Sequence, residues 1–263
     1  MQNTDHLGES RAPELHLHPN FYNIQAMAES WTPQELLRWA AGKFGARMEI
    51  ASAFGAEGIA LIEIASRVIK DLKIFILDTG FLFPETLELL NKVEQRYGIQ
   101  VERVLADVGV ELQGQLYEPA LWKRDPDLCC TIRKVQPLQK KLAGLKAWVT
   151  AIRRDQTRTR QNVRKVEWDT NFQLIKINPL ADWTQQMVWS YIAEHGLSYN
   201  PLHDQNYPSI GCIHCTRPIE NGEDERAGRW SGFQKQECGL HVPNVSGAYA
   251  QAAFIPLSDI KVD

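Results

Sequence analysis

The sequence predicts an α/β protein with a mostly parallel sheet and helices on both faces. Strand-like and helix-like segments alternate over the first two-thirds of the chain, and this alternation stops near residue 198. The composition, 44% hydrophobic and 23% charged over 263 residues, is that of a globular protein able to bury a full core. Repeated strand-then-helix order favours parallel strands, since each helix carries the chain back across the sheet.

The individual elements follow from short apolar runs and from helical periodicity. Five strands are predicted, over residues 48–52, 73–77, 100–106, 147–152 and 172–177. Four helices are predicted: 59–69 with one apolar face, a helix from Pro84 to about Tyr97, 132–142 interrupted at Pro137, and one capped by Asp182 that runs through His195.

Three regions of different character follow from this pattern. Residues 1–20 are predicted to be a flexible segment, 21–197 a nucleotide-binding α/β domain, and 198–263 a loop-rich, proline-broken segment packed on that domain. The first residues lack the apolar core of a secretion signal, so a cytoplasmic enzyme is expected. A net charge of −3 and the lack of a long apolar run give no case for nucleic acid or membrane.

Four of the five cysteines form two tight pairs, Cys129-Cys130 and Cys212-Cys215, while Cys238 stands alone. Four thiolates suit a zinc ion or an iron–sulfur cluster. Adjacent cysteines are awkward ligands for one ion, because successive side chains of an extended chain point apart, so a cluster is favoured over zinc. Buried inert thiols are the alternative, and a disulfide framework is disfavoured by length and low cysteine content.

The loops after the predicted strands collect the unusual residues, and ligands of such sheets bind at the carboxyl ends of strands. The turn 52–58 offers backbone N–H groups to an anion, although it lacks the P-loop lysine. Residues 78–80 suit a ribose or base, or form an ordinary turn. From 153 to 165 six basic residues accompany one acid; they either close over an anionic substrate or form a solvated loop.

The last candidate groups lie near the carboxyl end of the chain. Arg226 and Arg229 are three residues apart, so one helical turn puts both on one face, either as a phosphate or sulfate grip or as surface ion-pair partners. Cys238 and His241 share this spacing. His241 would keep Cys238 as a thiolate or orient the anion that it attacks. A buried, unreactive thiol is the alternative for Cys238.

These residues resemble a known family, the assimilatory sulfonucleotide reductases, and specifically the iron–sulfur adenosine 5'-phosphosulfate (APS) reductases of bacteria. The matching runs follow the family order: 52–57 (SAFGAE), 77–80 (LDTG), 129–135 (CCTIRKV), 153–156 (RRDQ), 200–204 (NPLHD), 211–215 (GCIHC), 225–230 (ERAGRW) and 237–241 (ECGLH). The cysteine pairs and the last run are highly specific, whereas wider relatives share the nucleotide loops.

The resemblance implies an adenine-nucleotide hydrolase-like fold related to the PP-loop ATPases, a homo-oligomer, and assimilatory sulfate reduction. Cys238 would attack the sulfur of APS, release AMP and form an S-sulfocysteine, from which thioredoxin or a glutaredoxin-like reductant releases sulfite. The expected [4Fe–4S] ligands are Cys129, Cys130, Cys212 and Cys215. Lys134, Arg226, Arg229 and His241 would hold the sulfate, and the expected nucleotide contacts are Ser52, Phe54, Gly55, Ala56, Glu57, Asp78, Thr79, Gly80, Arg153 and Arg154.

Three alternatives remain at this stage. PAPS reductases use the 3'-phosphorylated substrate and typically lack the cysteine pairs, but some cluster-bearing members accept both substrates, and the basic run 153–165 could take an extra phosphate. A PP-loop enzyme that thiolates tRNA would need a Ser-Gly-Gly-x-Asp-Ser loop, where this chain has Phe54-Gly55-Ala56-Glu57. A zinc-binding interaction module would be colourless. Ala51-Ser52-Ala53 also departs from the family's serine-rich loop.

Overall fold

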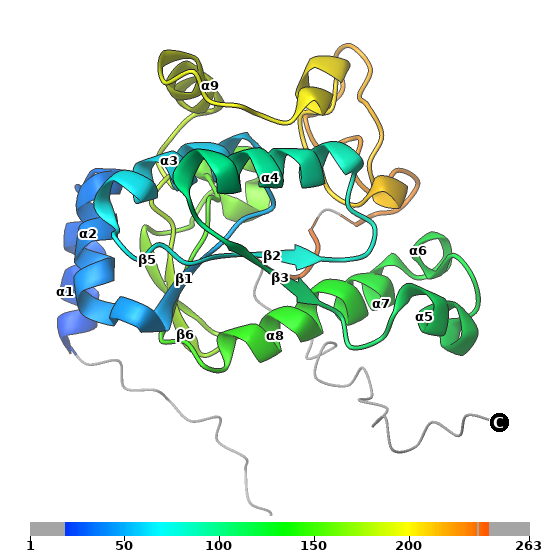
Figure 1. Ribbon diagram of the computed structural model, residues 1–263, viewed down its shortest axis with the longest axis horizontal. Helices are drawn as coiled ribbons and strands as arrows, with labels where there is room; N and C mark the ends of the chain where they lie inside the picture. Colours follow the sequence, from blue (N-terminus) through cyan, green and yellow to red (C-terminus); the bar gives the residue numbers. More distant parts are fainter. Residues whose placement is uncertain (1–18, 236, 242–263) are drawn as a thin grey trace, which may run out of the picture.

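The computed structural model describes residues 19–235 and 237–241 and contains one six-stranded sheet (Figure 1). The strand order is β3-β2-β1-β4-β6-β5, and all neighbours are parallel except β5 and β6. The strands are β1 (Met48–Ala51), β2 (Ile74–Asp78), β3 (Val101–Leu105), β4 (Ala147–Val149), β5 (Val166–Asp169) and β6 (Leu174–Ile177). The predicted mostly parallel sheet is therefore confirmed.

Helices cover both faces of the sheet, also as predicted. They are α1 (Pro19–Ala28), α2 (Pro33–Phe44), α3 (Ala56–Val68), α4 (Pro84–Tyr97), α5 (Val110–Tyr117), α6 (Leu121–Arg124), α7 (Pro126–Cys130), α8 (Gln136–Leu142) and α9 (Gln185–Glu194). Short 3₁₀ turns are η1 (Gly45–Arg47), η3 (Arg154–Gln156), η4 (Arg158–Arg160), η5 (Pro201–Gln205) and η6 (Ile213–Cys215).

Alternation along the strands divides the buried apolar residues between the two faces. In the larger core, Ile74 and Ile76 of β2 pack with helices α2, α3, α4 and α9. Phe75 points to the other face, where it packs with Trp148 of β4 and with Leu138 of α8. Figure 1 shows α3 and α4 above the sheet and α8 below it. Both faces are therefore buried, which explains the continuous apolar runs of the central strands.

Three local predictions were wrong. Strand β4 ends at Val149 rather than at residue 152. Helix α9 is capped by Thr184, whose Oγ1 accepts the Met187 amide at 3.2 Å, while Asp182 pairs with Lys165 Nζ at 2.7 Å. The chain also stays helical through Pro137, because η2 (Thr131–Val135) has π-helical winding between α7 and α8. Such a π turn is a frequent feature of functional sites.

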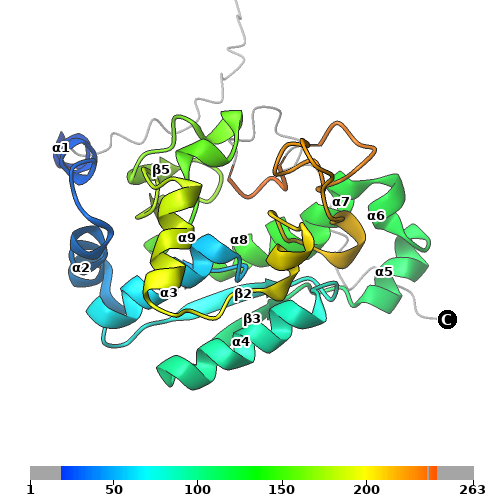
Figure 2. The ribbon, with the colours of Figure 1, turned by 90° about the horizontal axis from the view of Figure 1, so that it is seen from above.

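The segment after α9 lies along the carboxyl edge of the sheet. Leu82, beyond β2, forms a bridge with Cys212, and the Ile213 amide donates to the Phe81 carbonyl at 2.9 Å. Figure 2 shows this yellow-to-orange segment beside α6 and α7. In the described part of the chain, no helix is both long and apolar enough to cross a membrane. The prediction for residues 1–18, and that for 242–263, lies outside the described residues.

Candidate active site

A cavity of about 260 Å³ opens at the carboxyl ends of β1, β2 and β4. Each strand brings one predicted residue to its wall: Ser52 after β1, Thr79 after β2 and Arg153 after β4. The C-terminal segment supplies the opposite wall. The predicted site residues that line the cavity are Ser52, Gly55, Glu57, Thr79, Lys134, Arg153, Cys212, Arg226, Arg229, Cys238 and His241. Residues up to 189 positions apart in sequence therefore share one space.

The turn from β1 into α3 is held by packing rather than by a polar cap. Phe54 has a left-handed backbone (φ 58°), and its ring is buried in the main core, which offsets a conformational cost of about 1 kcal/mol. Ser52 Oγ accepts the Phe54 amide at 3.1 Å. Gly58 is required here, since a Cβ at that position would lie 2.6 Å from Ser52 Oγ. Gly55 has no side chain to cap α3, and Gly55, Glu57 and Gly58 at this N-terminus line the cavity, so uncapped amides lie beside it.

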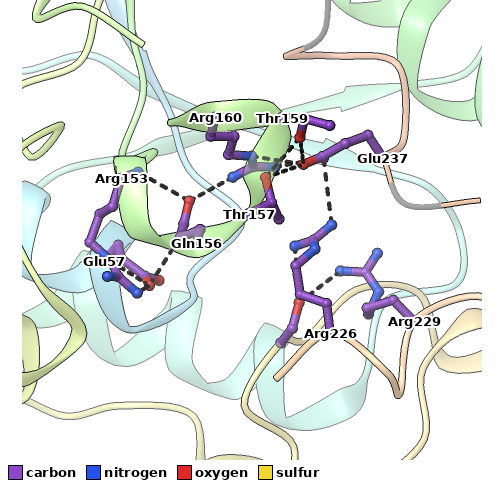
Figure 3. A network of polar contacts seen from close by, with 10 residues as sticks. Glu57, Arg153, Gln156, Thr157, Thr159, Arg160, Arg226, Arg229 and Glu237 are labelled. Carbon is purple, nitrogen blue, oxygen red and sulfur yellow. Dashed lines mark hydrogen bonds and ion pairs between the residues drawn. The ribbon is translucent and has the colours of Figure 1, made fainter. Parts of the chain in front are cut away.

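A network of polar side chains follows β4 (Figure 3). Arg153 is buried and donates through Nε and Nη2 to Glu57 Oε1, at 3.1 and 3.0 Å. Gln156 Nε2 donates to the same oxygen at 3.1 Å, and Gln156 Oε1 accepts from Arg160 Nη1 at 2.6 Å. The loop after β4 is thereby locked onto the first turn of α3. Charge-assisted contacts of this kind fix orientation as well as distance.

Four predicted nucleotide contacts do not line the cavity. Phe54 and Ala56 belong to the main core. Asp78 pairs with Arg103 and accepts the Gly80 amide at 3.0 Å, so both residues shape the turn after β2.

Arg154, the fifth predicted contact outside the cavity lining, lies away from it. Its Nε donates to the Val163 carbonyl at 2.7 Å, and it pairs with Glu29. Arg153 and Arg154 are neighbours in sequence, but their side chains lie in different environments, because successive side chains in an extended chain point apart.

Arg226 and Arg229 lie on one tight turn and approach each other, as their spacing predicts. Nη1 of each donates to Ser209 Oγ at 3.3 Å, and Figure 3 shows the two guanidinium groups close together. Both side chains line the cavity. The Arg229 guanidinium stacks on Trp230, with Cζ 4.5 Å from the ring centroid. It also covers Gly211, where a Cβ would lie 2.5 Å from Arg229 Cζ. Two guanidinium groups thus face one space, an arrangement suited to a sulfate or phosphate.

Cys238 and His241 complete the same cavity wall. His241 stacks on Trp148, with centroids 5.7 Å apart and planes at 13°. Burial, together with Lys176 and Arg160, lowers the His241 pKa well below its usual 6.5, so the imidazole is neutral in this arrangement. Its buried Nδ1 has no hydrogen-bond partner among residues 19–235 and 237–241. A neutral His241 ring can contact an anion through a hydrogen bond rather than through positive charge.

The four paired cysteines meet next to the cavity. Cys129 and Cys130 lie at the end of α7, so the pair is helical and not extended as assumed from the sequence. Burial, reinforced by Cys130, Cys212 and Cys215, raises the pKa of Cys129 to about 12. Burial and the other thiols raise the pKa of Cys215 to about 11. The thiols of Cys130, Cys212 and Cys215 all contribute to the pKa of Cys129, so the four cysteines are near one another. In the described ranges, however, no group of three or more His, Cys, Asp or Glu side chains could hold a metal ion.

Lys134 connects the cysteine patch with Cys238. Burial alone would lower its pKa, but the sulfurs of Cys212, Cys130 and Cys238 more than offset burial, so its pKa is raised and the ammonium stays charged. For Cys212, burial would raise the pKa, but Lys134 and a contact of 3.3 Å with Thr79 Oγ1 lower it overall. The buried Lys134 ammonium therefore interacts electrostatically both with the paired cysteines and with Cys238.

Sequence reasoning missed several residues that line the cavity. Arg160 was noted only as part of a basic run, and its position on a loop after a strand was the signal that could have singled it out. Ser209 and Trp148 carried no such signal, because a serine in a loop and a tryptophan in a strand are ordinary. Their role depends on neighbours that are distant in sequence.

Comparison with known proteins places this geometry in a family. A profile of the phosphoadenosine phosphosulfate reductase domain matches residues 47–218, which include all the strands of the described sheet and both cysteine pairs. This chain belongs to the phosphoadenosine phosphosulfate reductase family. The predicted family relationship is therefore confirmed.

Individual family members cover most of the chain. The adenosine 5'-phosphosulfate reductase 2 of Bacillus subtilis (strain 168) is 47% identical over 208 residues, 79% of this chain and 88% of that protein. The phosphoadenosine 5'-phosphosulfate reductase of Gloeobacter violaceus (strain ATCC 29082 / PCC 7421) is 45% identical over 224 residues, 83% of this chain and 93% of that protein. Relatives of similar identity thus carry two different substrate names.

Solved structures support the fold. The crystal structure of phosphoadenylyl-sulfate (PAPS) reductase from Candida auris, a phosphate complex, has a TM-score of 0.68 at 30% identity, covering 76% of this chain and 98% of that one. The Candida glabrata FMN adenylyltransferase has a TM-score of 0.51 at 13% identity, covering 82% of this chain and 80% of that one. The second likeness concerns the fold alone, and together they confirm the predicted α/β fold class.

Proposed function

We propose that this protein reduces adenosine 5'-phosphosulfate to sulfite and AMP through an S-sulfocysteine on Cys238, with thioredoxin or a similar dithiol protein as electron donor. The observation that carries the proposal is the shared cavity, in which one half-buried cysteine faces two arginines and a buried lysine at the carboxyl ends of the strands. The names of the relatives support the reaction class. Because the reaction consumes reduced dithiols, a cytoplasmic setting is part of the proposal.

The substrate anion has cations on several sides in this arrangement. Arg226 and Arg229 would hold the sulfate, with Lys134 near the attacking thiolate. The amides at the start of α3 and the Ser52 hydroxyl would receive the phosphate. Attack of a thiolate on an anionic group needs such cations, since the two negative charges otherwise repel each other.

The chemistry proceeds in two displacements. The Cys238 thiolate forms a bond to the sulfur of the sulfate, and the sulfur–oxygen bond to AMP breaks with its electron pair going to the phosphate oxygen. This leaves AMP and Cys238–S–SO₃⁻. A thiolate of the reductant then attacks Cys238 Sγ, and sulfite leaves with the electron pair of the S–S bond. The second reductant thiol resolves the mixed disulfide, so that Cys238 is again a thiolate and the reductant is oxidised.

We also propose that Cys129, Cys130, Cys212 and Cys215 hold a [4Fe–4S] cluster. The donor set fits this group, since four thiols, three of them buried and that of Cys215 half-buried, interact electrostatically, and each thiolate of such a cluster binds a different iron. When bound, the cluster supplies a fixed electrostatic environment beside Lys134. What this chain itself does there is to hold a charged ammonium between the patch and Cys238.

The choice of APS over PAPS rests on the cysteine pairs, which resemble those of the cluster-bearing enzymes. The test is sulfite release by anaerobically purified protein with reduced thioredoxin, with APS and PAPS measured side by side. We expect a clear preference for APS, four irons and four labile sulfides per chain, and a Cys238 adduct 80 Da heavier, as for any sulfonate. Preference for PAPS would overturn the substrate, and an adduct that persists in Cys238→Ser would overturn the nucleophile.

A further inference from the structure

The residue before Cys238 carries an unusually well-held carboxylate. The Glu237 side chain is 7% exposed. Arg160 grips it with both ends of its guanidinium, Nε to Oε1 at 2.9 Å and Nη2 to Oε2 at 2.7 Å. The hydroxyls of Thr157 and Thr159 each donate to Oε1 at 3.3 Å, as Figure 3 shows. Glu237 is therefore seated in a built pocket on the loop after β4.

The pocket also reaches the residues proposed to bind substrate. Arg226 Nη2 lies 3.5 Å from Glu237 Oε2, so the carboxylate helps to orient Arg226. Burial would raise the Glu237 pKa, but the hydrogen bond and charge of Arg160 lower it overall, so the carboxylate is ionised. Removing one partner of such a buried pair leaves an uncompensated charge, which makes the contact hard to break locally.

A second contact, an ion pair on the N-terminal side of Glu237, also holds the segment that carries Cys238. Lys235 pairs with Asp127 in α7, the helix that carries Cys129 and Cys130. Adjacent Cα atoms are about 3.8 Å apart, so an anchored Glu237 carboxylate leaves the Cys238 thiol little freedom of position. The two contacts together hold Cys238 at the cavity wall.

We propose that Glu237 is a positioning residue: gripped by Arg160, it holds the Cys238 thiol over the cavity for the attack on sulfur. The inference rests on the proposed function. Cys238 is half-buried at the cavity wall, and a thiolate of a protein dithiol has to reach its Sγ, so the proposal includes that the segment leaves this position before the adduct is reduced. The Glu237–Arg160 contact therefore favours the first displacement and opposes the second.

The first test needs no substrate. Holoprotein is treated anaerobically with iodoacetamide, and the modification of Cys238 is followed by peptide mass spectrometry in wild type, Glu237→Gln and Glu223→Gln. Glu223 is a matched control, since Arg217 grips it in the same two-fold manner at 2.8 Å, but it lies outside the cavity lining. We expect Glu237→Gln to raise the Cys238 alkylation rate about tenfold, and Glu223→Gln to leave it unchanged.

The second test separates the two displacements in single turnovers. Glu237→Gln should form the Cys238 adduct from APS about tenfold more slowly, while thioredoxin should release sulfite from the preformed adduct at least as fast as in wild type. A merely structural defect would slow both steps. If Glu237→Gln does not fold, Arg160→Lys, which keeps the charge but loses the two-point grip, is expected to behave in the same way.

The outcomes separate this inference from the proposed function. Equal alkylation of Cys238 in wild type and Glu237→Gln, or equal acceleration by Glu223→Gln, would overturn the positioning role. An adduct that is reduced more slowly in Glu237→Gln would also overturn it. If wild type forms no adduct from APS or PAPS while the alkylation difference persists, the proposed function fails and the anchoring by Glu237 stands.

Discussion

Gly211 gives a direct test of the proposed role of Arg229. A methyl group at position 211 would lie 2.5 Å from Arg229 Cζ, whereas ordinary van der Waals contact begins at 3.4 Å. The Arg229 guanidinium therefore has to move by about 1 Å in Gly211→Ala. The backbone at Gly211 does not require glycine, since its φ is not in the left-handed region. The perturbation thus acts on one side chain.

The expected effect is on activity rather than stability. A displacement of about 1 Å in a group that positions substrate costs about 100-fold in rate, so kcat/KM for APS should fall by 10- to 100-fold. The displaced atoms are the end of a flexible side chain, so the free energy of unfolding should change by less than about 1 kcal/mol. The assay is thioredoxin-coupled sulfite release, combined with thermal unfolding of the same sample.

Two other glycines provide controls. At Gly42 in α2 an added Cβ meets nothing within 4 Å, so Gly42→Ala should keep full activity and gain about 0.5–1 kcal/mol. At Gly228 the Cβ would run into the Arg217 backbone carbonyl, so Gly228→Ala should lose about 1–3 kcal/mol of stability. Wild-type kcat/KM in a fully folded Gly211→Ala protein would refute the assignment of Arg229 to the substrate.

Two further predictions concern residues outside the cavity lining. Tyr97 donates to Glu63 at 2.5 Å, so Tyr97→Phe should lower the free energy of unfolding by about 1.5 kcal/mol without changing activity. Burial would raise the Glu63 pKa, but the hydrogen bonds of Tyr97 and Arg67 lower it overall. The stabilisation that ionised Glu63 contributes is therefore complete above its unfolded pKa of about 4.3, and it is lost as the pH falls through the lower pKa of the folded state. Between neutral and acid pH, the melting temperature should therefore fall less in Tyr97→Phe than in wild type. An equal fall in both proteins would contradict the coupling of Tyr97 to Glu63. Arg154→Gln should lose about 1 kcal/mol of stability but keep KM for APS within about twofold, because Arg154 binds Val163 and Glu29. A tenfold rise in KM would instead indicate that Arg154 contacts the substrate.

Local patterns predicted the central part of the fold. The strands β1 and β2 and the helices α3 and α4 were found close to their observed bounds, because buried central strands of a parallel sheet are largely apolar. Strand β3 was also found, although it is a mostly exposed edge strand with a polar centre, Glu102-Arg103. Strand β5 was missed although Val166–Asp169 alternates apolar and polar residues, a pattern typical of a strand, because it is only four residues long. Helix α2 was missed although Thr32 and Glu35 form a capping box, a signal that the sequence does contain.

The sequence by itself determined which residues are chemically able to act. The sequence shows directly the cysteine pairs, the separate cysteine and the spacing of the arginines, because the possible chemistry of a residue depends first on its type and on its near neighbours in the chain. Only the tertiary structure decided their surroundings. Arg153 faces the cavity and Arg154 does not, His241 is neutral among buried cations, and Glu237 meets Arg160 from 77 positions away. The charge state and the orientation of a side chain depend on its burial and on the partners that folding brings to it. Neither the burial nor the partners can be inferred from the adjacent residues in the sequence.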